Sequence, residues 1–152
     1  MKEQYLSLSG LQNESEEMIQ EITRGRFRIN PRRWNADISR SALIITDMQN
    51  YFLLPDSHAF IPSATAILPN IIMLAGFFRK CNRPVIFTKH INDEDNAHSM
   101  NYWWKDMIRD ETPSAKLFDN LLTSGDIILE KNQYDAFHNT GLEEILLKHN
   151  VR

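Results

Sequence analysis

Three side chains capable of acid–base chemistry stand at the ends of short apolar segments. Asp47 comes shortly after the apolar run 42–45, Lys131 directly follows the run 126–130, and His90 ends a third segment of the same kind. A carboxylate can carry a proton, and a nearby ammonium stabilises negative charge and lowers the pKa of a thiol. If the segments are parallel strands, their carboxyl ends meet at the edge of the sheet where ligands bind. The spacing therefore predicts one site that contains Asp47, His90 and Lys131.

The segments that must position these residues alternate between strand and helix patterns. Strands are predicted at 42–45, 84–90 and 126–130, where apolar runs are bounded by turn residues. Between the first two, residues 63–81 place apolar side chains at helical spacing, and Pro69 predicts either a late start of the helix or a bend. This alternation predicts an α/β fold, a three-layer α/β/α sandwich with a central parallel sheet.

Further patterns predict where the helices begin and end. The pairs Asn13–Glu16 and Thr140–Glu143 have the spacing of a capping box, so they predict helices that begin at Asn13 and Thr140. Asn82 is predicted to end the helix at 63–81 in a left-handed conformation, and residues 149–150 are predicted to end the last helix. Residues 151–152 are then expected to open a fourth strand.

Residues 1–40 are predicted to form an N-terminal extension that precedes a domain of residues 41–152. The extension contains a helix and then an arginine-rich connection. Its arginines are Arg26, Arg28, Arg32 and Arg33. Such side chains can bind an anionic ligand, but pairing with surface acids is more common and is the favoured interpretation.

The composition limits the classes of partner. The 152 residues are 42% apolar and carry 17 basic and 20 acidic side chains, a formal charge of −3, which argues against nucleic acid or an anionic membrane as the partner. No segment approaches the ~20 apolar residues of a membrane helix, and the first ten residues lack the apolar core of a signal peptide. A single cysteine excludes an internal disulfide framework. We therefore expect a cytoplasmic protein whose partner is a small molecule.

Polar and aromatic side chains near the predicted edge are candidate substrate contacts. Each aromatic one by itself is more typical of a core or an interface, but as a set they could line an apolar pocket for a flat ring. Some belong to the segment 91–116, which is long enough for a lid or a pocket wall. Gln49 is expected mainly to hydrogen-bond loop backbone, with a substrate contact as the alternative. The candidates are Gln49, Phe52, His90, Trp103, Trp104, Tyr134 and Phe137.

Three segments carry a resemblance to a known family. They read ALIITDMQNYF (42–52), PVIFTKH (84–90) and ILEKNQYDAFHNTGLEEILLKHNV (128–151). In this order and spacing the chain resembles the isochorismatase-like cysteine hydrolases over most of its length. The resemblance implies a three-layer α/β/α sandwich, hydrolysis of a small amide or an enol ether, and assembly into dimers or tetramers.

The triad of this family consists of an aspartate, a lysine and a cysteine. By motif match, the resemblance implies that Asp47 takes the thiol proton and that Lys131 orients the pair and stabilises charge. The family's cysteine follows a fourth strand, which implies that this chain, ending at Arg152, is truncated before its nucleophile and is inactive alone. Cys81 ends a predicted helix at the opposite edge of the sheet, where the helix dipole raises a thiol pKa, so we expect it to be a packing residue.

The nicotinamidase branch of the family binds a metal near its site, which makes His90, Asp56 and His58 candidate ligands. The segment after the second strand reads KHINDED and does not reproduce the ligand spacing of that branch. We therefore expect no metal and no cofactor, and we expect His90 to be a polar residue at the edge of the pocket.

Two alternative interpretations assign the protein to a functional class other than the hydrolases. A non-catalytic binding or assembly module would keep the fold without the nucleophile and would show no hydrolysis. A flavodoxin-like nucleotide binder is disfavoured, because no glycine-rich phosphate loop follows a predicted strand and the whole chain has only five glycines.

Overall fold

The computed structural model describes residues 7–24, 37–104 and 106–152. The helices in this part are α1 (Leu8–Thr23), α2 (Asn50–Leu53), α3 (Ala64–Lys80) and α4 (Leu142–Lys148). The strands are β1 (Leu43–Ile45), β2 (Val85–His90) and β3 (Ile127–Lys131). Short 3-10 helices lie at Ile38–Arg40, His98–Tyr102 and Pro113–Ala115.

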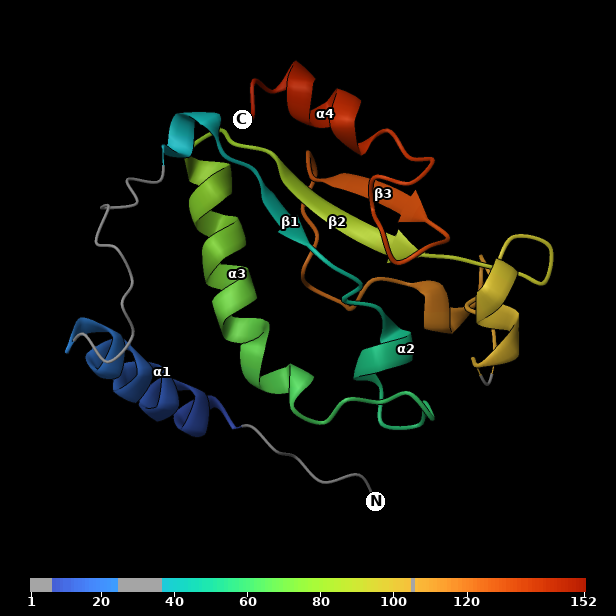
Figure 1. Ribbon diagram of the computed structural model, residues 1–152, viewed down its shortest axis with the longest axis horizontal. Helices are drawn as coiled ribbons and strands as arrows, with labels where there is room; N and C mark the ends of the chain where they lie inside the picture. Colours follow the sequence, from blue (N-terminus) through green and yellow to red (C-terminus); the bar gives the residue numbers. More distant parts are fainter. Residues whose placement is uncertain (1–6, 25–36, 105) are drawn as a thin grey trace.

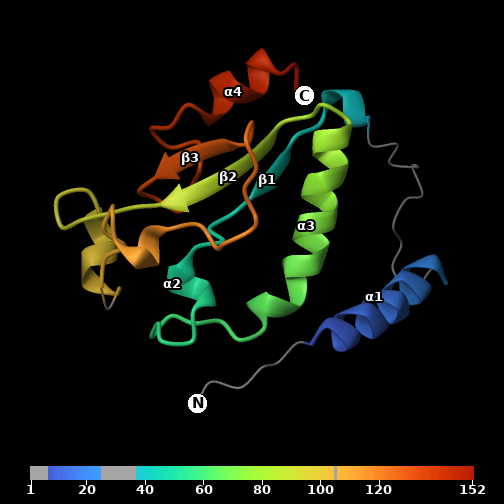
Figure 2. The same cartoon turned by 180° about the vertical axis from the view of Figure 1, so that it is seen from behind.

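The described strands form one parallel sheet in the order β1-β2-β3, with helices on both faces (Figures 1 and 2). α3 covers one face and α4 covers the other. Each strand lies within a residue or two of its predicted position. The predicted α/β fold with a central parallel sheet between helical layers is therefore confirmed.

β2 is the central strand, and its side chains alternate between the two helical layers. Val85 and Phe87 pack in the cluster on the α3 side, whereas Ile86 packs with Leu129 and Leu142 on the α4 side. Because the side-chain period of a strand is two, Lys89 lies on the same face as Phe87, and His90 lies on the face of Ile86. The apolar run of β2 therefore reflects burial on both faces, and the same alternation sends its last two polar side chains to opposite sides of the sheet.

Two asparagines end α3 and α4 in the same way. Asn82 and Asn150 have φ angles of 52° and 53°, the left-handed conformation of a helix C′ residue. After α3, Arg83 N–H donates to the Phe78 carbonyl at 2.9 Å, and after α4, Val151 N–H donates to the Leu146 carbonyl at 2.9 Å. Both predicted helix ends are confirmed. No strand is assigned to residues 151–152, where Val151 N–H closes α4 and Arg152 N–H donates to the Arg40 carbonyl at 3.1 Å, so the fourth strand stays a prediction.

α1 begins earlier than the sequence pattern predicted. Ser7 has extended backbone angles, and its Oγ accepts a hydrogen bond from Gly10 N–H at 3.0 Å. The helix therefore begins at Leu8 with Ser7 as its cap, and Asn13 lies inside it, so the predicted start at Asn13 is wrong. α1 lies beside α3. The predicted connection with Arg26, Arg28, Arg32 and Arg33 falls outside the described residues.

The other helix starts also differ from the capping patterns. α4 begins at Leu142 with Gly141 before it, rather than at Thr140. Thr140 Oγ1 nevertheless accepts a hydrogen bond from Leu142 N–H at 3.2 Å, so the hydroxyl still satisfies a helix-end donor. α3 begins at Ala64 and contains Pro69 in its second turn, so the late start that Pro69 suggested does not occur.

Candidate active site

Asp47 is held in a fixed position just beyond β1. Its φ angle is 54°, a left-handed conformation that aspartate tolerates better than most residues. Asp47 N–H donates to Thr88 Oγ1 at 3.1 Å, and the Thr88 hydroxyl in turn donates to Asp47 Oδ1 at 2.6 Å. Thr88, a residue of β2, thus orients the Asp47 side chain through one carboxylate oxygen, Oδ1. The other oxygen, Oδ2, is left for another partner.

That partner is Lys131, the last residue of β3. Its Nζ lies 2.9 Å from Asp47 Oδ2, and the lysine side chain is only 2% exposed. Nζ also donates to the Gln133 carbonyl at 3.1 Å and lies 3.4 Å from His90 Nδ1. The three residues predicted to meet at one edge of the sheet therefore do so, with Lys131 in contact with both Asp47 and His90.

His90 is an almost fully buried polar residue, 2% exposed. Burial lowers the pKa of His90 from its ordinary value of 6.5 to about 4, the Lys131 ammonium adds to the decrease, and the Asp47 carboxylate opposes it. The imidazole is therefore neutral at physiological pH. Its Nε2 is buried and has no hydrogen-bond partner among the described residues.

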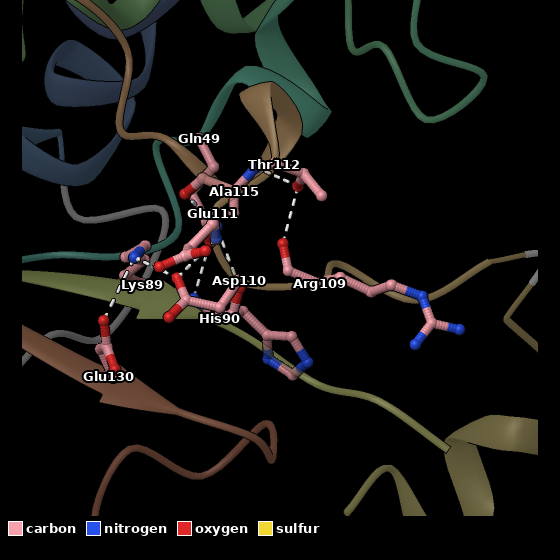
Figure 3. A network of polar contacts seen from close by, with 9 residues as sticks. All are labelled: Gln49, Lys89, His90, Arg109, Asp110, Glu111, Thr112, Ala115 and Glu130. Carbon is pink, nitrogen blue, oxygen red and sulfur yellow. Dashed lines mark hydrogen bonds and ion pairs between the residues drawn. The ribbon is translucent and has the colours of Figure 1, made fainter.

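Gln49 ties the loop after β1 to the end of β2 (Figure 3). It is fully buried, and its Oε1 accepts a hydrogen bond from His90 N–H at 2.7 Å. Its Nε2 donates to the His90 carbonyl at 3.0 Å and to the Ala115 carbonyl at 2.9 Å. Both amide hydrogens are used, so Gln49 has the backbone-bonding role expected from the sequence, and it fixes the backbone of His90.

A group of stacked aromatic rings adjoins His90. The Trp104 ring lies 5.2 Å from the His90 ring at an interplanar angle of 21°, and 5.9 Å from the Tyr51 ring at 8°. Trp104 Nε1–H donates to the Tyr134 hydroxyl at 2.9 Å. The structure thus joins Trp104 and Tyr134 to His90, whereas Trp103 is 64% exposed.

A family model described as an isochorismatase domain matches residues 41–152. Over 117 residues the chain is 32% identical to Nicotinamidase 3 of Arabidopsis thaliana. The aligned stretch covers 74% of this chain and 55% of the relative. Enterobactin synthase component B of Escherichia coli (strain K12) is also 32% identical, with 74% of this chain and 40% of the relative covered.

The chain belongs to the isochorismatase family. It spans about half the length of the curated relatives it matches, or less. Among solved structures, a cysteine hydrolase from Pseudomonas syringae pv. phaseolicola 1448A is similar with a TM-score of 0.71 and 27% identity, covering 78% of this chain and 59% of that one. The resemblance seen in the sequence is confirmed.

An apolar pocket of about 400 Å³ adjoins Asp47 in this isochorismatase-family chain. Asp47 and Thr46 are among its lining residues, and Phe52 is the aromatic residue of its wall. The other lining residues are Met48, Leu53, Ile61, Ser63, Ala64 and Ile67. Of the predicted pocket residues, Phe52 is therefore beside Asp47, whereas Phe137 is 56% exposed on the loop after β3.

The candidate metal ligands do not gather at one point. Tyr51 OH donates to Asp106 Oδ1 at 2.5 Å and lies 3.3 Å from His58 Nε2, while His90 contacts Lys131. Burial, and then the bond to Asp106, raise the pKa of Tyr51. The described part of the chain holds no cluster of three or more His, Cys, Asp or Glu residues arranged for a metal ion.

A larger hollow of about 830 Å³ lies away from Asp47, on the α3 side of β2 and β3. Lys89 lies in it between Asp110 and Glu130, with its Nζ 3.1 Å from a carboxylate oxygen of each (Figure 3). Its lining mixes these charges with apolar residues such as Ile128, and the acids are more than half exposed. This hollow is larger than the pocket beside Asp47, but it lacks the group formed by Asp47, Lys131 and His90, so the candidate site is taken to be at Asp47.

Cys81 lies where the sequence predicted. It caps the C-terminal end of α3 and precedes β2, so it is at the opposite edge of the parallel sheet from Asp47. The described helices include none long and apolar enough to cross a membrane.

Two contributions to the site were not predicted. Thr88 holds Asp47, and the Gln133 carbonyl holds Lys131. Thr88 could have been found, because it is a polar residue in an apolar strand and lies two positions before His90, on the same face. The Gln133 carbonyl depends on the course of the loop after β3, for which the sequence offers no comparable signal.

Proposed function

We propose that this isochorismatase-family protein is a hydrolase of a small amide or enol-ether substrate, with Asp47 and Lys131 as catalytic residues. The observation that carries the proposal is the contact of 2.9 Å between Asp47 Oδ2 and Lys131 Nζ at the carboxyl edge of the sheet. The Asp47 carboxylate, oriented through one oxygen, can carry a proton, and the nearly buried Lys131 ammonium beside it can stabilise negative charge.

For an amide, the proposed route is attack by a thiolate on the carbonyl carbon. Asp47 takes the thiol proton and passes it to the leaving nitrogen as the C–N bond breaks, and water then cleaves the thioester. Lys131 stabilises the negative charge during these steps. The single cysteine of the 152 residues, Cys81, lies at the opposite edge of the sheet, so this route requires a thiol that these residues do not supply.

For an enol ether, the proposed route needs no covalent intermediate. Asp47 acts directly as the acid that protonates the substrate, and water adds to the resulting cation. The two routes share the proton transfer at Asp47, so both predict the same loss when its carboxylate is removed.

The pocket beside Asp47 supports a small substrate with an apolar part. Its volume of about 400 Å³ falls in the range of small-molecule sites, and most of its lining is apolar. The pocket, with Phe52 in its wall, therefore supports a compact substrate with an apolar part.

The proposal is tested with the purified protein expressed from its natural reading frame. Nicotinamide, N-carbamoylsarcosine and isochorismate are suitable substrates to try, because the chain is similar to enzymes named for action on them. We expect turnover of one of these, and a decrease of at least about 100-fold in Asp47→Asn. Asparagine keeps the acceptor for Thr88 and tolerates the left-handed backbone, so the loss would report the carboxylate itself.

Two results would contradict the proposal. Full activity in Asp47→Asn would remove Asp47 from the mechanism. No hydrolysis of any of the three compounds by the wild-type protein would instead favour a binding or assembly module. The extension at 1–40, assembly into dimers or tetramers, a cytoplasmic location and the absence of a metal stay predictions.

A further inference from the structure

The Lys131 ammonium is buried and uses each of its three N–H donors. Its described acceptors are Asp47 Oδ2 at 2.9 Å, the Gln133 carbonyl at 3.1 Å and His90 Nδ1 at 3.4 Å. A buried ammonium requires such complete pairing, because an unsatisfied donor or an uncompensated charge is costly away from water. Of these three acceptors, His90 Nδ1 is the one that can also become a hydrogen-bond donor, since an imidazole nitrogen can carry a proton.

The position of Lys131 therefore fixes the protonation state of His90. An ammonium always donates, so Nδ1 must be the unprotonated nitrogen, and the single imidazole proton must be on Nε2. A protonated His90 would place two cations 3.4 Å apart. The charged groups that act on the ring are Lys131 from β3 and Asp47 from the end of β1. Lys89, the neighbouring cation on β2, lies on the opposite face of the sheet.

The surroundings of His90 hold the ring in this orientation. Gln49 hydrogen-bonds both the N–H and the carbonyl of His90, and the Trp104 ring stacks on the imidazole. The buried Nε2–H then has no acceptor among the described residues, and a packing role would not explain the cost of leaving it unpaired. An apolar ring would fill the same space without this cost.

We propose that His90 is a positioning residue that, as the neutral Nε2–H tautomer, directs the Lys131 ammonium onto Asp47. Its effect on catalysis rests on the proposed function, but the tautomer and the contact do not. The lysine chain is flexible and carries a point charge, so acceptors besides the carboxylate are needed to fix where that charge lies. His90 supplies one of them, and it does so without adding a second negative charge that would compete with Asp47 for Lys131.

The first test is nitrogen NMR of the ¹⁵N-histidine-labelled protein, with the His90 signal assigned from His90→Asn. We expect the Nε2–H tautomer at pH 7 and a ring that is still neutral at pH 5. Lys131→Met should raise the pKa of His90 by about one pH unit, whereas Asp47→Asn should lower it, because these charges act on the ring in opposite directions. An Nδ1–H tautomer, or shifts of the same sign in the two variants, would overturn the proposal.

Two variants of His90 separate the effect of its hydrogen-bond acceptor from the effect of its stacked ring. His90→Asn places a side-chain oxygen near the position of Nδ1 but loses the stacked ring, whereas His90→Phe keeps a ring against Trp104 and loses the acceptor. In the active protein we expect kcat to decrease about 100-fold in His90→Phe with little change in KM, and to recover at least tenfold in His90→Asn. His138→Phe, a change at an exposed histidine, is the matched control and should leave kcat unchanged.

The outcomes distinguish this inference from the proposed function. If Asp47→Asn retains activity while the tautomer and the opposite pKa shifts are found, the proposed function fails and the geometry stands. If His90→Phe is as active as His90→Asn, the positioning role fails even though Asp47 is catalytic. Because the NMR test does not depend on turnover, it also decides the tautomer if His90→Phe does not fold.

Discussion

Lys89 and Lys131 are two paired lysines at the ends of adjacent strands, and their surroundings differ sharply. In the sheet register His90 lies opposite Lys131, and Lys89 lies opposite Glu130, so the two lysines are one position apart on opposite faces. The Lys89 side chain is 18% exposed and contacts two carboxylates that are more than half exposed. The Lys131 side chain is 2% exposed and contacts one carboxylate and two neutral acceptors.

The difference shows what makes a charged pair suitable for chemistry. For Lys89, burial of the side chain acts against the charged form, but the bonds to Asp110 and Glu130 outweigh it and raise the pKa of the amine, and water can screen the charges. Lys131 has a single counter-ion in a site with little water, where each charge acts strongly on its neighbours. The pKa of His90 is lowered in that site. The Lys131 side of the sheet is therefore suited to proton transfer, and the Lys89 side to surface pairing.

The largest expected difference is in hydrolysis. Lys131→Met should lower the hydrolytic rate by at least about 100-fold, because it removes the charge beside Asp47, whereas Lys89→Met should stay within about twofold of wild type. Methionine keeps a similar length of apolar chain in both variants. The measurement is kcat/KM on the substrate found for the wild-type protein. Equal losses in the two variants would break the comparison.

The next effect concerns stability. Asp47→Asn removes the single anion beside a buried ammonium and should lower the free energy of unfolding by about 3 kcal/mol. Asp110→Asn removes one of two exposed partners of Lys89, so the urea midpoint should hardly change. Urea unfolding of the two variants at pH 7 measures both. A stable Asp47→Asn would show that Lys131 finds another arrangement when the carboxylate is lost.

The pH dependence of stability should follow His90. Its pKa is lower in the folded state, so the unfolded state binds more protons between pH 6.5 and 4. Stability should therefore decrease as the pH falls through this range, by about 2 kcal/mol between pH 7 and 4.5. The pKa of Asp126, paired with Arg79, is lowered below 3.8, so its contribution is lost only at more acidic pH. In His90→Asn the decrease between pH 7 and 4.5 should be smaller, and an unchanged decrease would assign it to other groups.

The smallest effect is the response to salt. The destabilisation caused by Lys89→Met should be under about 1 kcal/mol and should disappear in about 1 M NaCl, because exposed charges are screened. The destabilisation caused by Lys131→Met should persist in the same salt, since the Lys131 side chain itself is only 2% exposed. Urea unfolding at low and high salt measures this, and a salt-sensitive Lys131→Met would place that pair in contact with solvent.

The part of this architecture that depends on local pattern was predictable. Three apolar runs gave the strands, and their alternation with a helix gave the parallel sheet, so Asp47, His90 and Lys131 could be expected at one edge. The helix ends at Asn82 and Asn150 were also predictable, because asparagine tolerates the left-handed conformation.

The remainder depends on tertiary contacts that no short pattern specifies. Asn13 and Ser7 are both acceptable caps, and only the structure shows that Ser7 is used. The neutral state of His90 depends on burial and on Lys131, which is 41 residues away in sequence. Trp103 and Trp104 are adjacent and identical in type, yet Trp104 alone stacks on His90 among the described contacts.

A double-mutant cycle on Asp47 and Lys131 tests most directly whether the two residues act as one unit. Hydrolysis is measured for the wild type, Asp47→Asn, Lys131→Met and the double variant. If the pair works together, the double variant should be no slower than the slower single variant, because either change already disables the pair. Losses that multiply in the double variant would show that Asp47 and Lys131 act independently, and would contradict the account.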